Sequence, residues 1–187
     1  MCSATPRPLR LLLAGPPKIG KTTVVKQLVD QLQGAGVQVG GFLTHEVRGA
    51  DRQRVGFKLR DLAGAEVWLA HQNFDTGVQV GRFGVDVATF EQLGLAALRK
   101  ARNEAGVVII DEIARMELAS EAFVELVDDI FLGSLTIVAT VHVYEHPVSD
   151  ALKQRADIEL VSVTEANRDG LPEQLFRRLT HPATPDG

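Results

Sequence analysis

The sequence predicts an α/β fold with three layers, α/β/α, a mainly parallel central sheet and a β-rich insertion. Short apolar runs of the kind that form buried parallel strands alternate with longer segments that repeat apolar residues at helical spacing. A glycine-rich turn joins the first of these strands to the first helix. The length of 187 residues and the 45% hydrophobic content suit a single domain, residues 1–187, because two independent cores would be cramped.

The first strand, turn and helix contain a phosphate-binding motif. Residues 9–14 (LRLLLA) predict a buried strand, residues 21–33 predict an amphipathic helix, and residues 15–23 (GPPKIGKTT) match G-x-x-x-x-G-K-[ST]. In this motif backbone N–H groups and the helix dipole bind phosphate, the lysine reaches the β- and γ-phosphates, and the hydroxyl binds Mg²⁺. An accidental glycine-rich turn is the alternative, which both flanks disfavour. We therefore predict a P-loop NTPase fold with Thr22 as a magnesium ligand, Lys21 in catalysis, and nucleotide contacts from Gly15, Pro16, Pro17, Lys18, Ile19, Gly20, Lys21, Thr22 and Thr23.

The next part of the chain departs from strand-helix alternation. Residues 37–41 predict a second strand, and three further extended segments, at residues 42–46, 55–61 and 67–70, follow among glycine-containing turns. We interpret residues 42–70 as a β-rich insertion beside the parallel core. Two roles remain open for its arginines, which either contact phosphates or a second substrate or form a solvated hairpin surface: Arg48, Arg52, Arg54 and Arg60.

An acidic pair follows the most hydrophobic strand. Residues 86–103 predict a helix that begins at Asp86 or, by capping-box spacing, at Thr89, and residues 107–110 (VVII) predict a central parallel strand. That strand leads directly into Asp111 and Glu112, as a Walker B element does. We expect Asp111 to bind magnesium and Glu112 to orient the attacking water. The alternative is a pair of acids that caps the following helix.

The last third of the chain completes the alternation. Helices are predicted at residues 120–131, 149–155 and 172–179, and strands at residues 136–141 and 158–163. If the strand at 136–141 lies between the loop strand and the acidic strand, Thr140 and His142 become candidate γ-phosphate sensors; a structural role is the alternative for His142. We expect residues 1–8 to be a loose lead-in and the terminal HPATPDG to be frayed.

Composition restricts the partners and the location. The net charge of −4 provides no general nucleic-acid footprint, so we expect no stable nucleic-acid binding. The single cysteine, Cys2, cannot form an internal disulfide, and neither a membrane-length apolar run nor a signal peptide is present in the sequence. We expect a soluble, cytoplasmic monomer.

Four segments together resemble the thermophile-type nucleoside-triphosphatase family, which includes the human cancer-related nucleoside-triphosphatase. They are residues 40–48 (GGFLTHEVR), 80–87 (VGRFGVDV), 109–120 (IIDEIARMELAS) and 164–171 (TEANRDGL), and the resemblance extends from Leu9 to Leu179. It implies a P-loop fold and Mg²⁺-dependent hydrolysis of ATP, GTP and other nucleoside triphosphates to the diphosphate and phosphate. Loose base selectivity and slow turnover are also implied.

Two pairs of residues in these segments are candidates for contact with the nucleotide. The family commonly has Gly and Lys where this chain has Ala114 and Arg115, and arginine replaces a point charge by a planar fork suited to phosphate oxygens. We expect nucleotide contact from Ala114 and charge stabilisation from Arg115, with Arg82 the second candidate. Asn167 and Arg168 match the family's NRD segment and suit contact with the base or ribose, although ordinary turn chemistry is the equal alternative.

Three functions are compatible with these residues: a nucleoside-triphosphatase, a P-loop small-molecule kinase acting on a nucleoside or metabolite, and a nucleotide-gated binding module. The same loop, Mg²⁺ and arginines serve transfer to water or to a hydroxyl group. Glu112 beside Asp111 favours water, and the resemblance favours it further.

Overall fold

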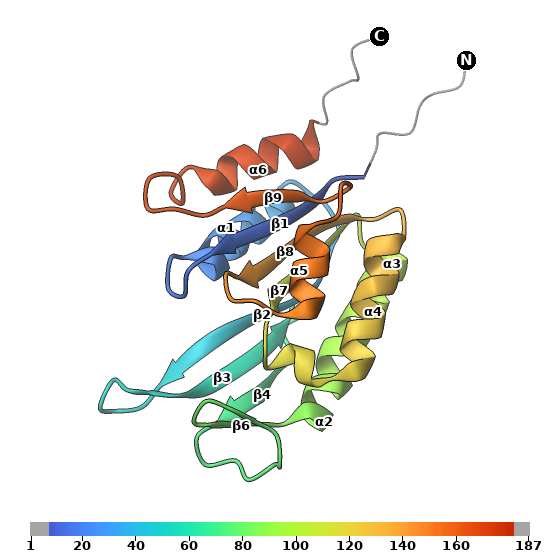
Figure 1. Cartoon of the computed structure of the whole chain (residues 1–187). Coiled ribbons are helices and arrows are strands. Elements are labelled where there is room, and N and C mark those ends of the chain that lie inside the picture. The colour runs from blue at the N-terminus through green and yellow to red at the C-terminus, as the bar shows by residue number, and fades with distance from the viewer. Residues whose placement is uncertain (1–7, 182–187) are drawn as a thin grey trace, which may run out of the picture.

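The computed structural model describes residues 8–181 and has a nine-stranded sheet between two layers of helices (Figure 1). The strand order is β5-β6-β4-β3-β2-β7-β8-β1-β9. The expected lead-in and frayed tail fall mainly on residues 1–7 and 182–187, which lie outside the described residues. The strands are β1 (Arg10–Gly15), β2 (Val39–Arg48), β3 (Arg54–Asp61), β4 (Glu66–His71), β5 (Gln79–Val80), β6 (Phe83–Val85), β7 (Val107–Ile113), β8 (Thr136–His142) and β9 (Glu159–Ser162).

One half of the sheet is parallel. β2 pairs with β7, β7 with β8, β8 with β1 and β1 with β9, all in parallel. The predicted place of β8, between the loop strand and the acidic strand, is therefore confirmed. Since the carboxyl ends of parallel strands meet at one edge, this order brings the ends of β1, β7 and β8 together.

The helices cover both faces of the sheet, and each face has its own hydrophobic core. Leucines and valines of α1 and α6 pack on one face, and those of α3, α4 and α5 pack on the other. This is the predicted three-layer arrangement. The helical elements are α1 (Lys21–Gly34), α2 (Val87–Phe90), the π-helical turn η1 (Glu91–Leu95), α3 (Ala96–Glu104), the 3₁₀ turn η2 (Glu117–Ala119), α4 (Glu121–Leu132), α5 (Pro147–Lys153) and α6 (Leu171–Thr180).

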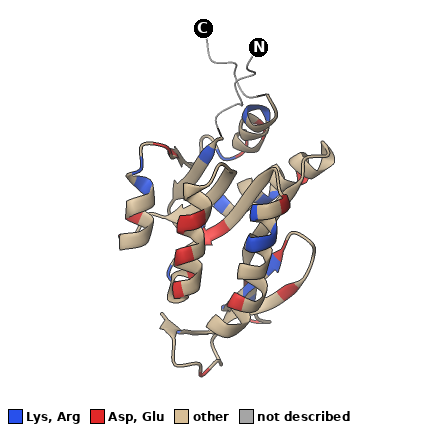
Figure 2. Cartoon of the chain, turned by 90° about the vertical axis from the view of Figure 1, so that its right-hand side faces the viewer, with Lys and Arg blue, Asp and Glu red and all other residues tan. Residues whose placement is uncertain are grey.

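Side-chain caps fix where two of these helices begin. The Asp86 carboxylate accepts a hydrogen bond from the Thr89 N–H at 2.9 Å, so the helix starts after Asp86 rather than at Thr89. The Ser120 hydroxyl accepts from the Phe123 N–H at 3.0 Å and so caps α4. Figure 2 shows acids along α4 and bases along α3, and across these helices Arg102 lies 3.8 Å from Asp129. Such a surface pair adds little stability.

β2 differs from its sequence prediction. The sequence indicates two extended segments, residues 37–41 and 42–46, whereas the structure has one continuous strand, Val39–Arg48. The two predicted segments join into one strand through Gly41: its φ of +117° and a 1.9 Å approach of an added Cβ to the Ile109 carbonyl oxygen require glycine.

The second half of β2 begins an antiparallel half of the same sheet. β3 pairs with β2, β4 with β3, β6 with β4 and β5 with β6, each antiparallel. Residues 42–70, interpreted from the sequence as an insertion beside the core, thus continue the central sheet directly (Figure 1). Among residues 8–181, no helix is both long and apolar enough to cross a membrane.

Candidate active site

The phosphate-binding loop joins the end of β1 to the start of α1. Gly20 has φ +112° and Lys18 φ +66°, the left-handed geometry that lets successive N–H groups point into one concavity. Lys21 is only 7% exposed, and its Nζ donates to the Gly15 carbonyl at 3.0 Å. A Cβ on Gly15 would lie 2.9 Å from Ile19 Cγ2 and 3.0 Å from the Val163 carbonyl, so the loop needs glycine here.

β7 carries the acidic pair to the same edge of the sheet. Asp111 is fully buried; its Oδ1 accepts from the Thr140 hydroxyl at 2.6 Å, while Oδ2 has no hydrogen-bond partner among the described residues. Burial raises the pKa of Asp111 to about 6; the hydrogen bond from Thr140 opposes that rise in pKa, and the neighbouring charge of Glu112 adds to it. A buried carboxylate with a free oxygen beside the Thr22 hydroxyl has the hard oxygen donors that Mg²⁺ prefers, so these residues fit the expected ion.

Glu112 has a different environment. Its side chain is 26% exposed and its Oε1 lies 3.2 Å from Lys21 Nζ. Because a loop lysine of this motif binds β- and γ-phosphates, this ion pair puts the carboxylate next to the place where a terminal phosphate would bind.

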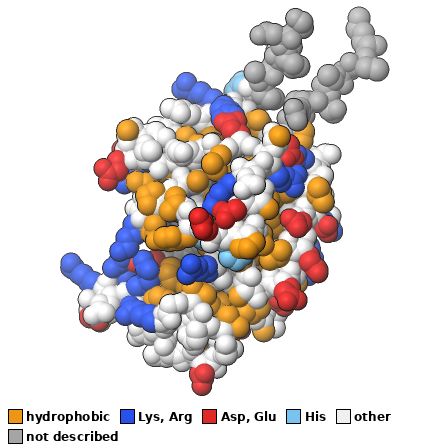
Figure 3. Space-filling model, in the orientation of Figure 1, with side chains coloured by type: hydrophobic (Ala, Val, Ile, Leu, Met, Phe, Trp, Pro, Cys, Tyr) orange, Lys and Arg blue, Asp and Glu red, His pale blue; other side chains and the backbone are white. Residues whose placement is uncertain are grey.

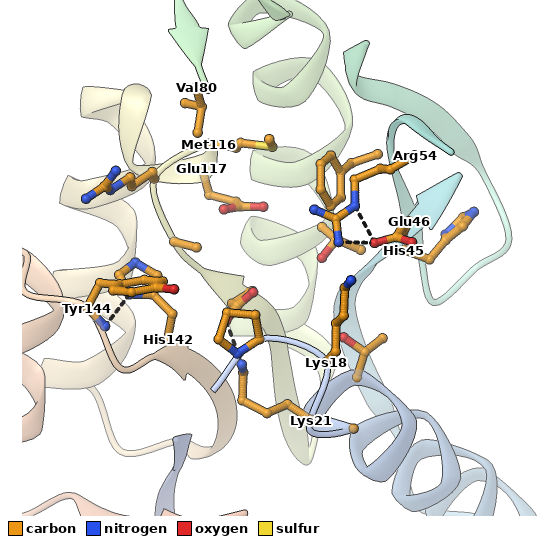
Figure 4. Close-up of a pocket in the computed structure, with 18 of the residues that line it drawn as sticks. Lys18, Lys21, His45, Glu46, Arg54, Val80, Met116, Glu117, His142 and Tyr144 are labelled. Atoms are coloured by element: carbon orange, nitrogen blue, oxygen red, sulfur yellow. Dashed lines mark hydrogen bonds and ion pairs between the residues drawn. The ribbon is translucent and has the colours of Figure 1, made fainter. Parts of the chain in front are cut away.

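A cavity of about 550 Å³ opens over the loop and the acidic strand (Figure 4). Of the residues assigned to the site from the sequence, nine line it: Pro17, Lys18, Gly20, Lys21, Thr22, Thr23, Glu112, Ala114 and Arg115. Six do not line it: Gly15, Pro16, Ile19, Asp111, Asn167 and Arg168. Gly15, Pro16 and Ile19 belong to the loop without lining the cavity, and Asp111 is fully buried.

The structure adds cavity residues that the sequence analysis does not assign. They come from β2, β3, β5, the turn after β7 and the end of β8: Thr44, His45, Glu46, Phe57, Val80, Met116, Glu117 and Tyr144. Most of them have no local pattern that marks a site, since they meet only through sheet pairing. Glu117 is the exception, because an acid between Met116 and Leu118, directly after the acidic strand, is a detectable signal.

Glu117 is a second buried carboxyl group in this site. It is 3% exposed, and its Oε2 lacks a hydrogen-bond partner within residues 8–181. Burial raises the pKa of Glu117 well above its ordinary value, and the nearby charges of Glu112 and Asp111 raise that pKa further. Such a group is costly unless something that binds the cavity supplies a donor.

His142 also faces the cavity. Its Nδ1 accepts a hydrogen bond from the Tyr144 N–H at 3.0 Å, and burial lowers the pKa of the ring. The neutral ring therefore carries its proton on Nε2, which has no hydrogen-bond partner in the described part of the chain. His142 thus offers one N–H donor to whatever occupies the cavity.

The candidate arginines differ in whether they line the cavity. Lys and Arg side chains gather over the β2–β3 hairpin (Figure 3), but of its arginines only Arg54 lines the cavity, where it pairs with Glu46. Arg115 lines the cavity from the turn after β7. Arg82 does not line the cavity; it donates to the Arg54 carbonyl, and its guanidinium carbon lies 5.2 Å from the Phe83 ring centroid.

The segment after β9 lies on the other side of the loop. Asn167 Oδ1 accepts from the Thr164 N–H at 2.8 Å and its Nδ2 donates to the Ser162 carbonyl at 2.8 Å, which are turn bonds. Arg168 Nη1 donates to the Ile19 carbonyl at 3.2 Å and so reaches the backbone of the phosphate loop. The turn interpretation therefore accounts for the Asn167 contacts, and a nucleoside contact from either residue stays a prediction.

Comparison with known proteins gives consistent matches. The NTPase family model matches residues 10–176. Nucleoside-triphosphatase THEP1 of Thermofilum pendens is 43% identical over 171 residues, which cover 90% of this chain and 93% of that protein. The crystal structure of THEP1 from Aquifex aeolicus has a TM-score of 0.84 at 33% identity, over 91% of this chain and 99% of that one.

A solved human protein is similar as well. The solution structure of a human cancer-related nucleoside triphosphatase has a TM-score of 0.79 at 31% identity, and the match covers 94% of this chain and all of that chain, 100%. The family match, the close relatives and both structures extend over nearly the whole described fold. The chain belongs to the NTPase family.

Proposed function

We propose that this protein hydrolyses nucleoside 5′-triphosphates, ATP and GTP among them, to the diphosphate and phosphate in a Mg²⁺-dependent reaction. The observation that carries the proposal is the ion pair between Glu112 and the loop lysine, with 3.2 Å between Oε1 and Nζ. This ion pair holds the Glu112 carboxylate beside the place where the terminal phosphate would bind. The relatives named nucleoside-triphosphatase support the same activity.

The loop binds the phosphates, and the loop and the acidic strand together provide the ligands for Mg²⁺. Backbone N–H groups of the loop and Lys21 bind the phosphates, and Thr22 and Asp111 would hold Mg²⁺. The ion, when bound, supplies positive charge against the phosphate oxygens. Asp111 suits this role because it is buried, oriented by Thr140 and left with one free oxygen in the described structure.

The hydrolytic step needs a placed water and a proton acceptor. Glu112 orients a water whose oxygen attacks the γ-phosphorus, while the bond from that phosphorus to the bridging oxygen breaks and the nucleoside diphosphate leaves. Glu112 receives the proton that the water loses. The guanidinium of Arg115 then faces the charge that develops on the phosphoryl oxygens.

Base selectivity should be low. Asn167, the residue most suited to read a base edge, already uses its amide in bonds to Thr164 and Ser162. Arg168 contacts the loop backbone. We therefore expect contacts to the sugar and phosphates to dominate binding, and we propose slow turnover, a cytoplasmic location and a monomer, as the sequence and its family resemblance imply.

Phosphate release from Mg²⁺ with ATP, GTP, CTP and UTP tests the proposal. We expect release from all four, with values of kcat/KM that agree within about tenfold, and loss of release in Lys21→Ala, because the phosphates lose their main cationic partner. Arg115→Ala should lower kcat by more than about tenfold, whereas Arg82→Ala is the matched control outside the cavity. Undiminished release by Lys21→Ala would remove the basis of the proposal.

A further inference from the structure

The cavity extends beyond the phosphate loop on the side away from the expected nucleoside. Asn167 and Arg168 follow β9, which borders β1 at one edge of the sheet, and none of residues 164–170 lines the cavity. Its walls come from β2, β3, β5, the turn after β7 and the end of β8. This inference rests on the proposed function and on the nucleoside contact predicted for Asn167 and Arg168: a triphosphate held there and by the loop leaves the part of the cavity facing these elements unfilled.

We name this part the outer chamber and define it by six residues: Phe57, Val80, Met116, Glu117, His142 and Tyr144. Figure 4 shows Val80, Met116 and Glu117 across the cavity from Lys21, with His142 and Tyr144 together at one side. The cavity of about 550 Å³ is far larger than the ~30 Å³ that one water takes in the liquid. Hydrolysis alone does not need apolar and aromatic walls at this place.

The walls suit a ring. Phe57 is held edge-to-face against Phe83, with ring centroids 5.4 Å apart, and the Arg54 guanidinium lies 5.1 Å from the Phe57 centroid. Tyr144 lies beside His142, with centroids 5.4 Å apart. Rigid aromatic and thioether surfaces of this kind bind flat, weakly polar molecules at low entropic cost.

The polar atoms suit an alcohol. Glu117 offers an oxygen that can accept a hydrogen bond, and His142 Nε2 offers an N–H donor; both lack partners in the described residues. A hydroxyl group both donates and accepts, so an alcohol can pair with either atom, whereas an ammonium group only donates. An aliphatic ring without a hydroxyl would leave the buried Glu117 oxygen unpaired.

We propose that the outer chamber binds an uncharged ring compound with an alcohol group, and that the protein transfers the γ-phosphoryl group to this alcohol in competition with water. The alcohol oxygen attacks the γ-phosphorus, the bond to the bridging oxygen breaks, and the nucleoside diphosphate leaves. Glu112 receives the alcohol proton, as it receives the water proton in hydrolysis, and a phosphate monoester is formed. Glu117 accepts a hydrogen bond from a second hydroxyl group of the ring compound and so holds it in the chamber.

The test uses γ-³²P-labelled ATP with Mg²⁺ and the full chain, with and without an acceptor. Adenosine, guanosine, cytidine, uridine and pyridoxine serve as probes, and chromatography separates labelled inorganic phosphate from labelled phosphate ester. We expect an ester from at least one probe. Inorganic phosphate without any ester would overturn this inference and leave the hydrolase proposal intact; the absence of both products would overturn both.

Variants locate the acceptor. Glu117→Gln should lower the ratio of ester to inorganic phosphate at least tenfold, and Glu125→Gln, the same change on the exposed side of α4, should leave that ratio unaltered. Val80→Trp, which fills the chamber from the short strand β5, should lower the ratio to a similar extent without touching a buried carboxylate. An unchanged ratio in both chamber variants would refute the assigned site.

Discussion

At the scale of single residues, two adjacent carboxylates acquire different chemistry from their surroundings. Asp111 is fully buried and oriented by Thr140, with a pKa raised by burial to about 6. Glu112 is partly exposed, paired with Lys21 and open to the cavity. The first environment suits a fixed ligand and the second suits a group that meets water, so substitutions at the two positions should have separate effects.

For Glu112→Gln we predict retained binding of Mg²⁺ and triphosphate with a fall in kcat of roughly 10²-fold or more. The amide keeps the size of the side chain but cannot take the proton of the attacking water. Nucleotide affinity by fluorescence titration and single-turnover hydrolysis measure the two effects separately. A variant that hydrolyses at the normal rate would exclude Glu112 as the base.

For Asp111 we predict a signature in stability against pH. Its pKa of about 6 in the folded protein exceeds the ordinary 3.8, so the folded state binds the proton more tightly than the unfolded chain. Unfolding free energy should therefore fall as pH rises from about 4 to about 6, by an amount on the order of 3 kcal/mol from this group. Asp111→Asn should lack this component and also weaken the Mg²⁺ dependence of turnover.

Denaturant unfolding in EDTA at several pH values measures this component in the wild-type protein and in Asp111→Asn. All other titrating groups are common to the two proteins, so the difference between their unfolding free energies isolates the contribution of Asp111. If the difference between the two profiles is flat from pH 4 to 6, burial does not penalise the Asp111 charge in solution.

The sequence predicts the roles of residues that belong to a motif, but it does not predict the roles of residues that other strands bring to the site. Lys21, Thr22 and the acidic pair have fixed spacings that carry their roles. Phe57 reaches the cavity only because β3 pairs with β2, whereas Glu117 follows the acidic strand closely enough to leave a local signal. The participation of Phe57 depends on tertiary pairing, which the local pattern does not show.

At the scale of elements, β2 shows where local interpretation fails. The sequence indicates separate extended segments on either side of the Gly41–Phe42 junction, yet one strand passes through Gly40, Gly41 and Phe42 unbroken. A Cβ on Gly40 would lie 2.7 Å from the Ala101 Cβ, so helix α3 packs directly on the strand at this point. The glycines allow close packing rather than a turn, while the β1-to-α1 unit and β7 were predictable because their apolar patterns agree with their tertiary places.

We predict that Gly41→Ala destabilises the protein by at least about 2 kcal/mol, because its φ of +117° and the 1.9 Å contact with the Ile109 carbonyl both oppose a Cβ. Thermal or urea unfolding provides the measurement. Gly34→Ala is the control: no atom lies within 4 Å of its added Cβ and the residue is helical, so the change should be neutral or slightly stabilising. Equal effects at the two positions would contradict the account of β2.

At the scale of the whole molecule, the phosphate loop lies where the contributions of five strands meet. β1 carries the loop, β7 and β8 carry the acids and His142, and β2 and β3 form the opposite wall of the cavity. Nucleotide bound at this junction would contact the loop and the acidic strand β7, which is hydrogen-bonded to β2, the strand that both halves of the sheet share. It should therefore stabilise the entire fold rather than one lobe.

We predict a concentration-dependent rise in melting temperature with Mg²⁺ and a non-hydrolysable ATP analogue, in one cooperative transition. At about 100 times the dissociation constant, linkage gives roughly 2.7 kcal/mol of added stability. Differential scanning calorimetry checks both the shift and the single transition. Lys21→Ala should lose most of the shift, and a wild-type protein that shows none would argue against a nucleotide site in the loop.

β2 also determines how far the cavity can change shape. Its first half is hydrogen-bonded to β7 and its second half to β3, with Phe42 and Leu43 shared by both pairings. The cavity wall at Thr44 and Glu46 and the strand that bears the acids are therefore parts of one hydrogen-bonded unit. Swinging the hairpin outward would break backbone bonds in the middle of the sheet, so the aperture over the loop has a fixed width. Ligands are then selected by whether they fit a rigid opening, rather than by the closing of a lid.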